Sequence, residues 1–130
     1  MGKAGPKAIV LDAGALIAFE RAEARMRALL REALKVRARL IIPAAVVGQV
    51  FRDRATQVAL RALLDGPTTH VPPLDRTLAE AAGVLCGRAG TSDVIDASVV
   101  LTARREHAVV VTSDVEDFTR LDPALKVERV

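Results

Sequence analysis

Short apolar runs alternate with longer segments of mixed polarity along this chain. Residues 8–11, 40–42 and 109–112 are almost continuously apolar, which is typical of strands buried inside a parallel sheet. Weaker strands are expected at residues 69–71 and 126–130. Since these strands alternate with helical segments, the pattern predicts an α/β fold whose mainly parallel sheet is covered on both faces.

The segments between the strands show helical periodicity. The clearest helix places apolar residues three and four positions apart, at Met26, Leu29, Leu30, Ala33 and Leu34. We expect Gly87 and Gly90 to end one later helix, and Ser92 to cap the next. The predicted helices cover residues 14–19, 26–34, 43–51, 56–64, 78–87 and 92–107.

Length and composition favour one domain. The chain has 130 residues, of which 51% are hydrophobic, so we predict a single domain over residues 1–130 with a flexible start at residues 1–6. No apolar run reaches the roughly 18 residues of a membrane span. The first apolar run is too short for a signal peptide. The expected protein is therefore soluble and cytoplasmic.

Several classes of site are excluded by composition. Cys86 is the only cysteine, so an intrachain disulfide and a cysteine-based zinc site are ruled out, and we interpret it as a core residue. Trp and Tyr are absent, which disfavours binding of nucleic acid by base stacking.

The charge is unevenly distributed. The net charge is only +3, but one segment is rich in cations that would suit the phosphate backbone of a nucleic acid. A solvated helix face is the alternative interpretation. The cations of this segment are Arg21, Arg25, Arg27, Arg31, Lys35, Arg37 and Arg39.

Four aspartates stand where buried backbone is expected. Asp12 and Asp114 end two of the apolar strands, while Asp93 and Asp96 open an apolar helix. Ligands bind beyond the carboxyl ends of strands in open α/β sheets, so Asp12 and Asp114 can face one cleft if their strands are neighbours. All four carboxylates converge if the start of the apolar helix points at the same cleft. Such a cluster is costly unless a cation neutralises it, and Mg²⁺ or Mn²⁺ prefers oxygen ligands.

Each acid also has a structural interpretation. Acids in the first turn of a helix interact favourably with the helix dipole, and Asp114 can be a simple helix cap. His70 and His107 lie far from the acids in sequence, and we interpret both as structural.

The layout resembles a PIN domain, most closely the VapC-type toxins of toxin–antitoxin pairs. Three matching segments occur in order over nearly the whole chain: residues 9–18, 93–100 and 111–118. The resemblance implies a three-layer α/β/α fold and endoribonuclease activity dependent on Mg²⁺ or Mn²⁺. It also implies an RNA substrate, a cognate VapB-like antitoxin and a homodimer.

The same resemblance assigns roles to individual residues. Asp12 would be the first metal ligand, Asp93 the acid that opens the later helix, and Asp114 the acid after the last inner strand. Asp117 would bind a metal-bound water or hold a neighbouring side chain. Ser113 would donate a hydrogen bond to a carboxylate or a phosphate.

The chain departs from the family pattern at one position. Many PIN domains carry a glutamate on the helix after the second strand, where this chain has Gln49. Glutamine offers a carbonyl oxygen but no negative charge, and we hypothesise that Asp96 supplies the missing charge. Arg52, one turn beyond Gln49, would contact phosphate, pair with an acid or serve a structural role.

The leading hypothesis is an endoribonuclease that cleaves RNA with metal-activated water, with Asp12, Asp93, Asp96 and Asp114 as metal ligands. One alternative is a PIN-like module that has lost catalysis and binds RNA or an antitoxin, with Gln49 as the sign of that loss. A phosphotransfer receiver is disfavoured, because Ala13 follows Asp12 and no lysine occurs between Lys35 and Lys126.

Overall fold

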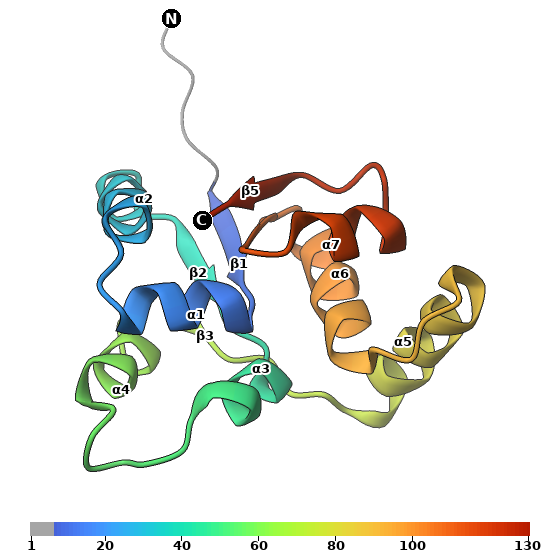
Figure 1. Cartoon of the computed structure of the whole chain (residues 1–130), viewed down its shortest axis with the longest axis horizontal. Helices are drawn as coiled ribbons and strands as arrows, with labels where there is room; N and C mark the ends of the chain where they lie inside the picture. Colours follow the sequence, from blue (N-terminus) through green and yellow to red (C-terminus); the bar gives the residue numbers. More distant parts are fainter. Residues whose placement is uncertain (1–6) are drawn as a thin grey trace, which may run out of the picture.

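The computed structural model describes residues 7–130 as a five-stranded sheet with seven helices (Figure 1). The strands are β1 (Ala8–Leu11), β2 (Arg39–Ile41), β3 (Thr69–His70), β4 (Val109–Thr112) and β5 (Val127–Arg129). The helices are α1 (Ala13–Glu20), α2 (Ala24–Lys35), α3 (Ala44–Val50), α4 (Val58–Leu64), α5 (Arg76–Ala89), α6 (Val94–Glu106) and α7 (Val115–Leu121).

The strand order is β3-β2-β1-β4-β5, and every pair is parallel. Strand β1 lies in the middle because all four of its residues are buried and apolar, which a strand covered on both faces requires. Its register on β4 pairs Val10 with Val110 and Leu11 with Val111. The carboxyl ends of β1 and β4 therefore lie side by side, which is the condition under which Asp12 and Asp114 can face one cleft.

The helices form a layer on each face of the sheet. Right-handed crossovers place α1–α4, which follow β1 and β2, on one face, and α5–α7 on the other. The contacts agree, since α1 packs against α2, α3 and α4, while α6 packs against α5 and α7. Both α1 and α6 contact β1 and β4. The three-layer α/β/α fold is thus confirmed (Figure 1).

The core lies between these layers and includes Cys86, which is buried as expected. No helix within residues 7–130 is long and apolar enough to cross a bilayer. The expected flexible start, residues 1–6, lies outside the described residues. The single domain stays a prediction.

Some local expectations are wrong. Helix α5 continues through Gly87 and ends only at Gly90, whose φ of 71° suits glycine. The cap of α6 is Asp93 rather than Ser92. Helix α4 begins at Val58, two residues after the predicted start. Leu34 is 65% exposed, because it lies on the outer edge of the apolar stripe of α2, away from Met26 and Ala33.

Candidate active site

The acids gather where the strand order reverses direction. From β1 the chain first adds β2 and β3 on one side and later adds β4 and β5 on the other. The carboxyl ends of β1 and β4 therefore flank the topological switch point, where open α/β sheets bind ligands. Asp12 follows β1 directly, and Asp114 follows β4 after one intervening residue.

Asp12 is held rigidly at this point. It is the N-cap of α1, and its Oδ1 accepts a hydrogen bond of 2.9 Å from the backbone N–H of Ala15. Its Oδ2 accepts one from the hydroxyl of Thr112. Only 6% of Asp12 is exposed, and this burial raises the pKa of its carboxyl although both hydrogen bonds lower it. The nearby charge of Asp114 raises this pKa further.

Thr112 connects two of the acids and was not anticipated from the sequence. Its fully buried hydroxyl donates to Asp12 and accepts a hydrogen bond of 2.9 Å from the backbone N–H of Asp114. A polar residue at the last position of an apolar strand was the available signal. Its importance depended on the register of β1 and β4, which brings together residues 100 positions apart.

Helix α6 contributes the second pair of acids. Asp93 caps its N-terminus and accepts a hydrogen bond of 2.9 Å from the backbone N–H of Asp96. Burial raises the pKa of Asp96 to about 7, and the charges of Asp93, Asp12 and Asp117 act in the same direction. These electrostatic effects require that carboxylates from three segments lie near one another.

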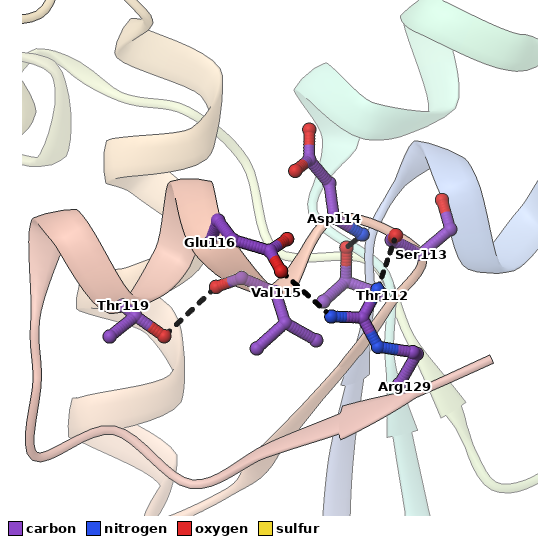
Figure 2. Close-up of polar contacts among 7 residues, drawn as sticks. All are labelled: Thr112, Ser113, Asp114, Val115, Glu116, Thr119 and Arg129. Atoms are coloured by element: carbon purple, nitrogen blue, oxygen red, sulfur yellow. Dashed lines mark hydrogen bonds and ion pairs between the residues drawn. The ribbon is translucent and has the colours of Figure 1, made fainter.

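Asp114 and Asp117 form the third group, at the start of α7. Asp114 occupies the N-cap position, but its side chain makes no capping hydrogen bond. The pKa of Asp114 is raised, first by a hydrogen bond with the carboxyl of Asp117. A limited loss of hydration and the charge of Asp117 raise it further. Figure 2 shows the Asp114 carboxylate pointing away from the ion pair of 3.0 Å between Glu116 and Arg129.

The four aspartates differ in how far their side chains are buried. Only Asp12 is buried, while Asp96 is half-buried and Asp93 and Asp114 are exposed. The reason is that Asp93 and Asp114 precede their helices at the rim of the sheet, where the side chains meet solvent. The acidic cluster is therefore open to solvent on this side.

Ser113 lies against the start of α1. Its side chain is exposed and projects toward α1 (Figure 2). A Cβ atom at Gly14 would collide with the Ser113 hydroxyl. The absence of a side chain at Gly14 therefore allows this hydroxyl to lie close to the helix that Asp12 caps.

Gln49 and Arg52 both belong to the region of α3. Gln49 is exposed on this helix, which packs against α1. The Arg52 guanidinium donates hydrogen bonds of 2.8 Å and 2.9 Å to the carbonyls of Gly48 and Phe51. Arg52 thus binds carbonyls at the C-terminal end of α3, and it forms no ion pair with an acid within residues 7–130.

The donor chemistry of the cluster fits a hard divalent cation. All donors are carboxylate or hydroxyl oxygens. Within the described chain no ion pair involves any of the five aspartates of the cluster, which are Asp12, Asp93, Asp96, Asp114 and Asp117. Among residues 7–130, however, no three His, Cys, Asp or Glu side chains lie close enough together to share a metal ion. Side chains of exposed acids would have to rotate to complete such a site.

The whole architecture has known relatives. The model of the PIN domain family matches residues 9–123. A search of curated proteins finds no match. Three similar solved structures are VapBC2 from Rickettsia felis bound to a DNA fragment from their promoter, DNA-bound VapBC from Salmonella typhimurium and FitAcB from Neisseria gonorrhoeae.

These structures resemble the chain over almost its full length. The Rickettsia structure has a TM-score of 0.70 at 18% identity, covering 95% of this chain and 98% of the other. The Salmonella structure has a TM-score of 0.66 at 19% identity, with 94% and 97% covered. The Neisseria structure has a TM-score of 0.63 at 19% identity, with 92% and 95% covered. At these identities the similarity supports the fold.

Proposed function

Because this chain belongs to the PIN domain family, we propose that it is a metal-dependent endoribonuclease and the toxin of a toxin–antitoxin pair. The observation that carries the proposal is the placement of the aspartates at the switch point, where Thr112 bonds both Asp12 and Asp114. The carboxyl groups also raise one another's pKa. Carboxylates that raise one another's pKa without a cationic partner are typical of sites that bind divalent cations.

In this proposal Asp12, Asp93, Asp96 and Asp114 hold Mg²⁺ or Mn²⁺, and Asp117 supports them from the first turn of α7. When bound, such an ion lowers the pKa of water and stabilises negative charge on phosphate oxygens. The products would be a 5′-phosphate and a 3′-hydroxyl.

The residues of the chain orient this chemistry. Thr112 fixes one oxygen of Asp12 and the backbone N–H of Asp114, so the two acids keep a constant relative position. Asp12 is further restrained by the N–H of Ala15. The exposed Ser113 hydroxyl would donate a hydrogen bond to the phosphate of the RNA.

Substitution of the acids tests this assignment. We expect Asp12→Asn or Asp93→Asn to abolish RNA cleavage in Mn²⁺, because each removes one carboxylate charge while preserving size and a capping oxygen. Cleavage of labelled RNA and the circular dichroism spectrum would be measured together. Removal of Mn²⁺ with EDTA should abolish wild-type cleavage in the same assay.

Asp65→Asn is the matched control, since Asp65 is exposed at the end of α4 and should be dispensable. Full cleavage by both site variants would refute the assignment. Folded wild-type protein that binds RNA or an antitoxin without cleaving RNA in Mn²⁺ would favour the alternative of a binding module.

Gln49 allows a second test of the metal site. Gln49→Glu restores the acid that many PIN domains have, so we expect tighter binding of Mn²⁺ or altered preference between Mn²⁺ and Mg²⁺ in calorimetric titrations. Gln57→Glu would not serve as a control, because the Gln57 side chain donates hydrogen bonds to the Glu20 carboxylate and the Val50 carbonyl. An unchanged titration would place Gln49 outside the site.

A protein partner is part of the proposal. The similar solved structures contain VapBC and FitAB-type complexes, which supports an antitoxin as the partner of this chain. Co-expression with the product of a small adjacent gene, followed by co-purification and loss of RNA cleavage, would test it. Homodimer formation would be measured on the same samples by light scattering.

A further inference from the structure

Helix α2 and the residues around it carry a net positive charge, whereas the rest of the molecule has a net negative charge. Residues 21–39 contain seven cations and two anions, whereas the remaining residues contain 12 cations and 14 anions. The positive charge is thus concentrated in one short part of the chain. We define the α2 patch as the exposed arginines Arg21, Arg25, Arg27, Arg31 and Arg37.

In the part of the chain that the structure describes, the arginines of the α2 patch form no ion pair with an acid. Within residues 7–130 the ion pairs of this region involve Lys35 with Glu32 and Arg39 with Glu106, and none involves the five patch arginines. Arg27 and Arg31 are four positions apart, so they share one exposed face of α2. Arginine binds phosphate through a planar fork of donors, and five unpaired guanidinium groups match a polyphosphate backbone.

Arg37 provides an independent observation. It follows α2 in a left-handed conformation with φ of 53°. Its N–H bonds the carbonyl of Leu34 and the N–H of Ala38 bonds that of Ala33, which is a Schellman motif whose left-handed position favours glycine. An arginine at this position extends the patch beyond the C-terminus of α2.

The α2 patch is connected to the acidic site by α1. Asp12 caps the start of α1 and Arg21 caps its end, a separation of about 12 Å for an eight-residue helix. Helix α2 packs against α1 beside this far end (Figure 1). A nucleic acid that occupies the acidic site and follows α1 can therefore reach Arg21 and the start of α2.

We propose that the α2 patch is an exosite that binds the phosphate backbone of RNA outside the scissile segment. This inference rests on the proposed ribonuclease function and identifies a second contact surface for the same substrate. The exosite anchors large RNA through charge, while the aspartates act at the cleavage position. It predicts that RNA length and salt concentration affect affinity through α2.

Binding of fluorescein-labelled transfer RNA in EDTA tests the exosite without cleavage. Arg27→Gln/Arg31→Gln should weaken binding on the order of tenfold at low salt and reduce the slope of log affinity against log salt by about 1.5. Arg88→Gln/Arg120→Gln is the control, because both residues are exposed and unpaired within residues 7–130 but lie on α5 and α7. Equal effects of the two pairs, or no effect of the first, would overturn the exosite.

Arg37→Gly separates function from stability. The substitution should raise the thermal unfolding midpoint, because glycine relieves the left-handed strain, and yet weaken binding of transfer RNA several-fold. Ala22→Gly is the control, since Ala22 has φ of 54° and no charge; it should raise the midpoint without changing RNA affinity. A gain in stability with unchanged affinity for Arg37→Gly would contradict the proposal.

Cleavage assays distinguish the exosite from the proposed function. On a short oligonucleotide in Mn²⁺, Arg27→Gln/Arg31→Gln should retain the wild-type kcat, whereas on transfer RNA its KM should rise. If cleavage is normal and both RNAs behave alike, the exosite fails and the function stands. If the wild type neither binds nor cleaves RNA, the proposed function and the exosite fail together.

Discussion

The buried carboxylate of Asp12 is stabilised by donors that come from different parts of the chain. The N–H of Ala15 is local, whereas the hydroxyl of Thr112 comes from β4. A buried carboxylate without such donors would cost several kcal/mol. Even with them, its pKa remains raised, so the site retains unfavourable electrostatic energy that a bound cation would relieve.

At this scale the sequence predicted residue types better than their environments. It singled out Asp12, Asp93 and Asp114 from their positions beside apolar segments. It did not predict that Asp93 and Asp114 are exposed, because their exposure results from their positions at the starts of α6 and α7. It missed Thr112 and assigned the cap of α6 to Ser92. Hydrogen-bond partners distant in sequence, and the choice between adjacent capping residues, depend on tertiary geometry.

The raised pKa of Asp96 affects how the stability of the metal-free protein depends on pH. Its pKa is about 7 in the folded protein against 3.8 ordinarily, so between these values the folded state holds a proton that the unfolded chain has lost. Stability therefore falls as pH rises through this window and levels off above about 7. Because Asp96 is half-exposed, the change is on the order of 1 kcal/mol after solvent screening.

Urea unfolding in EDTA across this pH range would measure the effect. Asp96→Asn should reduce the slope of the profile, because the amide does not titrate, while the raised pKa values of Asp12 and Asp114 leave a smaller fall in the same direction. The lowered pKa values of Glu106 and Asp122 make stability rise with pH, but only below the ordinary pKa of these two groups. A wild-type profile parallel to that of Asp96→Asn would contradict the assignment.

At the scale of elements, several helices end in the same way. The residues just after α1, α2, α5 and α6 all have positive φ, yet only one of them is glycine: Ala22, Arg37, Gly90 and His107. A residue other than glycine in this conformation costs roughly 1 kcal/mol. The positions of glycines in the sequence therefore predict the end of α5 but not the ends of α1, α2 and α6.

Two substitutions in and after α5 should have opposite effects. Gly87 is exposed inside the helix, and a Cβ atom there would meet open space, so Gly87→Ala should stabilise the protein by about 0.5–1 kcal/mol. Gly90→Ala should destabilise it by about 1 kcal/mol, because Gly90 has φ of 71°. Chemical denaturation of both variants gives the comparison, and changes of the same sign would show that α5 ends elsewhere.

Strands were predicted more accurately than helix boundaries. The predicted bounds of β1 and β4 match the structure, because buried central strands form nearly continuous apolar runs. The start of α4 was less predictable. The Gln57 side chain fixes the preceding loop by bonding the N–H groups of Arg52 and Asp53 and the carbonyl of Val50, contacts that leave no periodic signal.

At the scale of the whole molecule, strand order determines whether the acids can meet. Alternating elements predicted a parallel sheet, and the pairing of β1 with β4 was a condition that the sequence alone did not establish. The structure meets this condition by returning from β3 across the sheet through α5 and α6. The carboxylates of three distant segments consequently lie at one edge of the sheet, while the α2 patch stays at the far end of α1.

The distance along the chain between Asp12 and Thr112 also affects biosynthesis. Domains are made from the N-terminus, so β1, β2 and β3 can pair with α1–α4 in place while β4 and the acids after α5 have not been made. The α2 patch is complete at that stage, but the aspartate cluster is not. By the roles proposed above, a nascent chain would be able to hold RNA before it is able to cut it.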